Sequence, residues 1–124
     1  MAGTVVASTI NNDTGLFATN NAYLGIAKAW VQYNGTTGAV NGAFNVSSVT
    51  RNGTGNYTVN FTTAMSNANY AWAIGYNVNP GSGQRNLGYF EAETLSTSAI
   101  QIFQTDSGGA AWDITATAVT ILGS

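Results

Sequence analysis

Hydrophobic and polar residues alternate with a period of two along most of the chain. The clearest alternation runs through "NYTVNFT", residues 56–62, where Tyr57, Val59 and Phe61 are separated by polar side chains. No stretch keeps the i, i+3, i+4, i+7 apolar spacing of an amphipathic helix for long enough to predict one. The pattern therefore predicts an all-β protein with little or no helix.

Turn-forming segments such as "NNDTG", "YNGTTG", "NPGSGQRN" and "TDSGGA" separate the candidate strands. The remaining candidate strands are 4–10, 26–33, 43–50, 69–78, 86–93, 98–105 and 112–122. About eight strands without intervening helices favour a single antiparallel β-sandwich, jelly-roll-like, over βαβ units. We expect residues 1–24 to form an N-terminal arm with the first strand, and residues 25–124 to form the sandwich domain.

The stretch "FNVSSVTRNGTGNYTVNFTTAM", residues 44–65, contains the strongest turn signal. Its middle lacks the glycine spacing of a phosphate-binding loop and leads into a strand rather than a helix. It predicts a hairpin with a loop of about four or five residues, in which Asn52 and Gly53, or Gly55, have positive φ. The alternation breaks near Ser48 and Val49, which predicts a β-bulge.

Two of the candidate strands are apolar on both faces. In 69–78 a face of Ala and Gly lies opposite a face of large apolar residues, and 112–122 is partly apolar on both sides. Strands of this kind are buried on both sides, either by a loop of the same chain or by another copy of it. The second alternative predicts a subunit interface at Ala71, Ala73, Gly75, Val119 and Ile121.

The small number of charged residues limits the classes of partner that the protein can bind. The chain has three basic and five acidic residues and no His, with a net charge of −2. This is too little positive charge for a nucleic-acid surface or a basic membrane-surface helix. Abundant aromatic residues, with three Trp, six Tyr and five Phe, favour a folded chain over a disordered one.

The sequence contains no Cys, so neither a disulfide framework nor a thiolate metal site is expected. The N-terminus lacks the basic and apolar regions of a signal peptide, and the longest mostly apolar segment, "TATAVTIL", is too short to cross a bilayer. We therefore expect a soluble protein made without secretion, with no membrane insertion and with unused N-x-S/T triplets.

Catalytic candidates are few, because the usual nucleophilic triads need His or Cys. Lys28 is better explained by an aliphatic stem lying beside Trp30 than by catalysis. Glu91 and Glu93 share a strand face about 6.5–7 Å apart, a separation that an inverting glycosidase could use. Solvated acids on a strand also discourage edge-to-edge pairing, and we favour that interpretation.

Asp106 and Asp113 flank "SGGAAW" in a spacing that matches no EF-hand loop, so turn formation is favoured over calcium binding. The sequence thus predicts a protein that is not an enzyme and holds no cofactor or metal. Aromatic faces beside Asn and Thr could still stack on sugars, and the candidate ligand or surface contacts are Trp30, Tyr33 and Arg85. Tyr57 and Trp72 are expected in the core.

One segment resembles a known family. "AKAWVQYNGTTGAVNGAFNVSSVTRNGTGNYTVNFTTAMSNANYAW", residues 27–72, is similar to a module of tail-fibre and other virion structural proteins of tailed bacteriophages, including cyanophages. The similarity covers a little over a third of the chain and involves structural rather than catalytic residues. It implies a non-enzymatic, β-structured virion component, usually trimeric and exposed on the particle.

About 25 residues precede this segment, so no long fibre shaft is expected before it. This favours a homotrimeric capsid decoration (cement) protein that clamps the capsid through its N-terminal segment. The alternative is a receptor-binding tip of a tail fibre that contacts host-surface polysaccharide. The expected partners are other copies of the chain and the major capsid protein or another tail protein, and the expected location is the virion.

Overall fold

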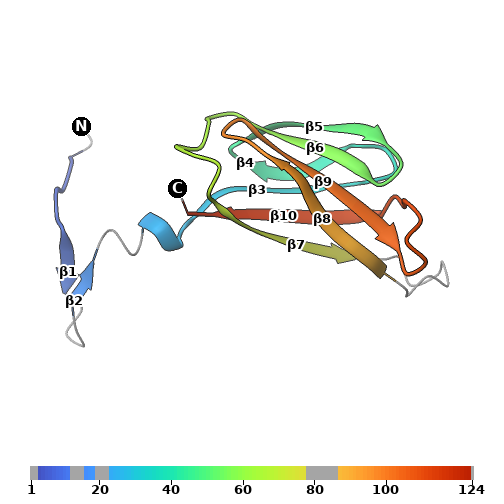
Figure 1. Cartoon of the computed structure of the whole chain (residues 1–124). Coiled ribbons are helices and arrows are strands. Elements are labelled where there is room, and N and C mark those ends of the chain that lie inside the picture. Colours follow the sequence, from blue (N-terminus) through green and yellow to red (C-terminus); the bar gives the residue numbers. More distant parts are fainter. Residues whose placement is uncertain (1–2, 12–15, 19–22, 78–86, 124) are drawn as a thin grey trace.

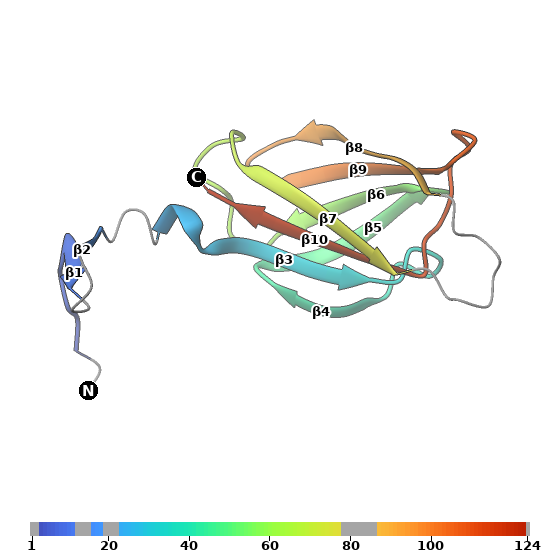
Figure 2. The same ribbon diagram turned by 90° about the horizontal axis from the view of Figure 1, so that it is seen from below.

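The computed structural model describes residues 3–11, 16–18, 23–77 and 87–123 (Figure 1). The N-terminal segment contains a two-stranded antiparallel hairpin, β1 (Thr9–Asn11) with β2 (Leu16–Ala18), and one helical turn at residues 23–25. Figures 1 and 2 both place this hairpin beyond one end of the main body. The main body begins with β3.

The main body is a β-sandwich of two four-stranded antiparallel sheets, which confirms the fold class predicted from the alternation (Figure 2). Sheet 1 has the order β4-β3-β10-β7, and sheet 2 has the order β5-β6-β9-β8. Sheet 1 contains β3 (Ala27–Tyr33), β4 (Val40–Phe44), β7 (Ala71–Asn77) and β10 (Ala116–Leu122). Sheet 2 contains β5 (Val46–Gly53), β6 (Asn56–Phe61), β8 (Leu87–Leu95) and β9 (Ala99–Asp106).

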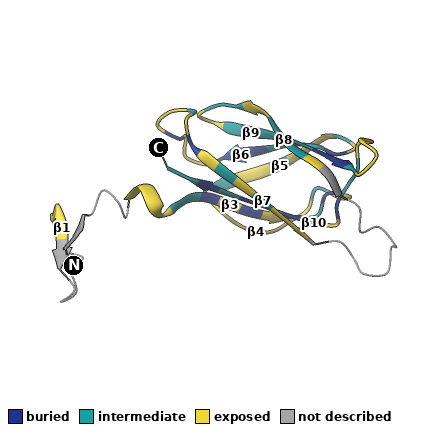
Figure 3. Ribbon diagram, turned by 60° about the horizontal axis from the view of Figure 1, so that its bottom comes forward, coloured by how far each residue is buried: buried dark blue, intermediate teal, exposed yellow. Residues whose placement is uncertain are grey.

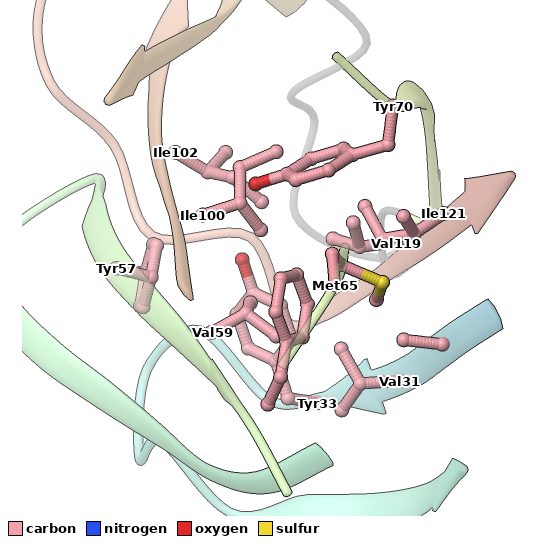
Figure 4. Close-up of a cluster of buried hydrophobic side chains, with 12 residues drawn as sticks. Val31, Tyr33, Tyr57, Val59, Met65, Tyr70, Ile100, Ile102, Val119 and Ile121 are labelled. Carbon is pink, nitrogen blue, oxygen red and sulfur yellow. The ribbon is translucent and has the colours of Figure 1, made fainter. Parts of the chain in front are cut away.

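The core lies between the sheets and is filled by every second residue of the central strands. Figure 4 shows side chains from β3, β6, β9 and β10 meeting there. Two ring pairs extend through it, with centroids 5.1 Å apart for Tyr33 and Tyr57 and 5.9 Å apart for Phe61 and Tyr70. Burying one large apolar side chain contributes roughly 1.5–3 kcal/mol. The core residues are Ala29, Val31, Tyr33, Tyr57, Val59, Phe61, Met65, Tyr70, Ile100, Ile102, Val119 and Ile121.

The predicted strand 43–50 is wrong as a single strand, because the chain changes sheets at Asn45. Asn45 has a φ of +53°, a left-handed conformation that Asn tolerates better than most residues. Its side-chain amide donates to the carbonyl oxygens of Lys28 (3.0 Å) and Thr63 (3.1 Å), and its Oδ1 accepts from the Thr63 amide (2.7 Å). Asn45 therefore ties the corner between β4 and β5 to both neighbouring segments.

The predicted hairpin is confirmed as β5–β6, and the register shift between Val46 and Ser48 matches the predicted bulge. The positive φ falls on Gly55 (+69°), not on Asn52 or Gly53. A Cβ at Gly55 would lie 2.4 Å from the carbonyl oxygen of Gln104. Both the backbone angle and the available space therefore require glycine at this position.

The other strand predictions differ at their ends. The first strand is shorter than the predicted 4–10, β4 was not predicted, and the last strand begins at Ala116 rather than at residue 112. Thr36 and Thr37 donate backbone amide hydrogens to Asn34 Oδ1 in the turn before β4, which lets the chain reverse. The turn signal "YNGTTG" was thus identified without the strand that follows it.

Candidate functional site

The most distinctive surface is the outer face of sheet 1. On the edge strand β7 it presents Ala71, Ala73 and Gly75, all exposed, which alternate with the half-buried Trp72 and Ile74 that pack against the core. Figure 3 shows exposed and intermediate segments alternating along this strand. On β10 the outward positions are Ala116, Ala118, Thr120 and Leu122, which are half-buried. Short side chains make this part of the face nearly flat.

Cross-strand register places two larger rings on the same face. Thr120 is paired with Ala73 on one side and with Trp30 on the other, and Trp30 is paired with Phe44. Trp30 is 43% exposed and Phe44 is 55% exposed. The far end of the Trp30 indole reaches across to Gly42, where a Cβ would lie 3.4 Å from it. The outer face of sheet 1 therefore runs from small residues on β7 and β10 to two aromatic rings on β3 and β4.

Charge is almost missing from the described residues of this face. Lys28 is the one charged residue among its outward positions on β3, β4, β7 and β10, and its Nζ lies 3.2 Å from the ring centroid of Tyr23. That geometry is a cation–π contact between the start of the sandwich and the N-terminal segment. The outer face of sheet 1 can therefore be covered without burying an unpaired charge.

The structure corrects two of the five residues predicted at a subunit interface. Ala71, Ala73 and Gly75 lie on the outer face as expected, but Val119 and Ile121 are each 1% exposed and belong to the core. They alternate with Ala118, so their side chains point between the sheets. The outward apolar residues of β10 are Ala116, Ala118 and Leu122, which the same alternation could have identified.

The residues predicted as ligand or surface contacts also differ in where the structure places them. Trp30 is exposed on the outer face of sheet 1, whereas Tyr33 is fully buried against Tyr57 and cannot contact a ligand at the surface. Tyr33 is three positions from Trp30 on β3, so the alternation of the strand turns its side chain inward. Arg85 lies outside the described residues. Tyr57 is buried and Trp72 packs against the core, as predicted.

The outer face of sheet 2 has the opposite chemistry, because its amide and hydroxyl side chains hydrogen-bond to one another. Asn52 Nδ2 donates to Asn56 Oδ1 (2.9 Å) and Thr58 Oγ1 (2.8 Å). Asn60 Nδ2 donates to the hydroxyl oxygens of Ser48 (3.1 Å) and Thr50 (3.3 Å). This face is a polar ladder, and water can replace its bonds at little cost.

Glu93 belongs to the same ladder. Its Oε2 accepts hydrogen bonds from Asn56 Nδ2 (3.0 Å) and Gln101 Nε2 (2.8 Å), and the register of β8 shifts between Ala92 and Thr94. The Glu91 and Glu93 side chains are therefore not presented by a regular strand, as the predicted spacing assumed. Glu93 acts in this structure as an acceptor for two amides.

An ion pair that the sequence did not predict joins β5 to the connection between β9 and β10. Arg51 on β5 donates from Nη2 (2.6 Å) and Nε (3.2 Å) to Asp113 Oδ2, just before β10. Asp113 Oδ1 accepts from the amide of Gly55 (2.8 Å) and from the Tyr57 hydroxyl. Burial alone would raise the pKa of Asp113, but these donors outweigh it and hold the pKa below its usual value. Burial and the hydrogen bond to Asp113 raise the pKa of Tyr57.

Asp106 forms a turn, as predicted. Its Oδ1 accepts from the amides of Gly108 (2.8 Å) and Ala110 (2.9 Å).

Within the described ranges, no three Asp, Glu, His or Cys side chains gather in a way that could hold a metal ion. The same part of the chain contains no helix with the length and hydrophobicity to span a membrane.

Comparison with known proteins gives no match, since no family model, curated protein or solved structure is significantly similar to the chain. The chemistry of the two outer faces is therefore the main structural guide to function.

Proposed function

We propose that the protein is a non-enzymatic structural component of a bacteriophage virion, acting as a homotrimeric capsid decoration protein. The observation that carries the proposal is the outer face of sheet 1, which presents small residues on β7 and β10, two exposed aromatic rings on β3 and β4, and almost no charge. The biological setting comes from the resemblance of residues 27–72 to virion modules of tailed phages, which is an interpretation of the sequence alone.

The two outer faces suit a protein held between a particle and solvent. Interface cores are poor in charge, and Ala and Gly let another backbone approach closely, which suits the outer face of sheet 1. The polar ladder of sheet 2 suits the side that remains in water. The partners are sister subunits and the major capsid protein or another tail protein.

The direct test is to locate the chain on purified particles. Mass spectrometry should find it among the particle proteins, and cryo-electron microscopy should show trimeric density of its size on the capsid. Analytical ultracentrifugation of the purified chain at micromolar concentration should give a mass three times that of the 12.8 kDa monomer. Density confined to the tail tip would disprove the decoration role.

Trp30 favours a second candidate function. An exposed indole beside Gln32 and Thr120 combines a stacking surface with hydrogen-bonding groups, which suits a sugar ring of a host-surface polysaccharide. The protein would then be the receptor-binding tip of a tail fibre. Purified protein should block phage adsorption, and Trp30→Ala should abolish the block while Tyr23→Ala, another exposed aromatic, should retain it. No glycan binding by the parent protein would reject this candidate.

A further inference from the structure

The N-terminal segment exposes apolar side chains that its own sandwich does not cover. Val5 is 91% exposed and Val6 is 95% exposed, in a stretch without regular secondary structure. Closer to the sandwich, Leu24 is 48% exposed and Ile26 is 60% exposed. Exposed apolar side chains grouped in this way are typical of a segment that binds another surface.

The position of the N-terminal arm explains why it does not cover the outer face of sheet 1 in its own chain. The arm enters the sandwich at Ala27, which is paired with Leu122, and Leu122 is paired in turn with Ala71. It therefore departs from one end of the outer face of sheet 1. Figures 1 and 2 show it continuing away from that end rather than folding back over the sheet.

We propose that residues 3–6 of one copy pack on the outer face of sheet 1 of a second copy, over Ala73 and Ala118. This inference rests on the self-association in the proposed function and names the contact that produces it. The two surfaces match in chemistry, because residues 3–6 carry no charged side chain and the face around Ala73 and Ala118 consists of small uncharged residues, Gly75 and Thr120 among them. Neither surface has to give up a hydrated charge on binding.

The arrangement also accounts for a closed oligomer. Each copy provides one arm and one face, so the contact joins two different surfaces and can be repeated head-to-tail from copy to copy. Such contacts form a ring when the rotation between copies closes, and a trimer is one such ring. The extended backbone of the arm then lies directly on the small residues of β7 and β10. An extended segment can bind there because it does not need a deep groove.

The absence of Cys from the whole sequence permits a clean cross-linking test with full-length chains. Val5→Cys and Val6→Cys are each mixed with a differently tagged Ala73→Cys chain and oxidised mildly. A disulfide needs its Cβ atoms roughly 3.5–4.5 Å apart, so only neighbouring positions are captured efficiently. The matched control is Thr50→Cys, which is exposed on the polar face of sheet 2.

We expect an arm-to-face heterodimer for at least one arm variant with Ala73→Cys, at least tenfold above the yield with Thr50→Cys. Equal yields with both would overturn the inference. If the mixed chains remain trimeric but no arm-to-face product forms, the arm contact is wrong while the proposed self-association stands. If the chain is a monomer whose arm cross-links to neither position, both the arm contact and the proposed self-association are rejected. Arms that cross-link only to capsid protein on particles also reject the contact between copies.

Discussion

The two outer faces of the sandwich share one backbone pattern and differ in almost everything else. Both belong to four-stranded antiparallel sheets, and both sheets send alternate side chains into the same core. On sheet 1 the outward residues include Ala71, Ala73 and Gly75, whereas on sheet 2 they include Asn56 and Asn60. The first set cannot hydrogen-bond through its side chains, and the second set is hydrogen-bonded already.

This difference means that the residues that stabilise the fold and the residues that could bind a partner lie on opposite faces of the same strands. The core depends on the inward half of each strand, so the outward half is free to vary with the environment of each sheet. Sheet 2 has the outward residues of a surface that stays in water. Sheet 1 has those of a surface that is covered, and a charge placed there should disturb association more than folding.

The largest effect is expected for Ala73→Glu. Ala73 is exposed in the single chain, so the free energy of unfolding should change by less than about 0.5 kcal/mol. In the oligomer the same carboxylate becomes buried without a partner, which costs about 3 kcal/mol and weakens association at least ~100-fold. Sedimentation equilibrium over a concentration series measures the shift.

Thr50→Glu provides the matched control, because it introduces the same charge on the polar face of sheet 2. It should leave association within about twofold of the parent, since a solvated charge on an exposed strand costs little. Equal weakening by both variants would show that general charge repulsion, and not the chemistry of one face, governs the assembly.

The next effect concerns Asn45, where the chain passes from sheet 1 to sheet 2. Asn45→Ala removes three side-chain hydrogen bonds and leaves a residue with a Cβ at positive φ, so the free energy of unfolding should fall by about 2–3 kcal/mol. Asn45→Gly loses the same bonds but tolerates the backbone angle. It should recover about 1 kcal/mol in urea titrations, and a glycine variant no better than alanine would mean that φ is not a source of the loss.

A smaller effect tests the ion pair at the other end of β5. The pKa of Asp113 is lower in the folded chain than in the unfolded chain, so the unfolded state binds more protons in acid. This stabilisation is fully present above the unfolded pKa of about 3.9 and is lost as the pH falls through the folded value. Melting temperatures of the parent should therefore begin to fall as the pH drops below about 4.

Asp113→Asn isolates that contribution. The variant should unfold more easily at neutral pH by about 1–2 kcal/mol, because Tyr57 and Gly55 lose a charged acceptor. The difference from the parent should shrink as the pH falls below the unfolded pKa of about 3.9 and through the lower pKa that Asp113 has in the folded parent. A constant difference at every pH would assign the loss to packing and not to the charge.

The sequence predicted the fold class better than it predicted which residues of each strand face inward. Strict alternation around Tyr57, Val59 and Phe61 located the core and the fold class. It failed for Tyr33, Val119 and Ile121, which were assigned to contacts although their parity with Ala29, Val31 and Thr117 points inward. Asn45 was missed because one left-handed residue changes the sheet without breaking the apolar pattern. Arg51 and Asp113 are 62 residues apart in sequence, and no local pattern reports that pairing.

The smallest effect is expected on the polar ladder. Asn52→Ala removes the hydrogen bonds to Asn56 and Thr58, but all three groups can bond to water on an exposed face. The free energy of unfolding should therefore fall by no more than about 0.5 kcal/mol, and association should not change. A loss above about 1.5 kcal/mol would mean that the ladder is a structural element of sheet 2. In that case polarity on this face would reflect internal bonding, and the contrast with sheet 1 would no longer identify which side of the protein faces water.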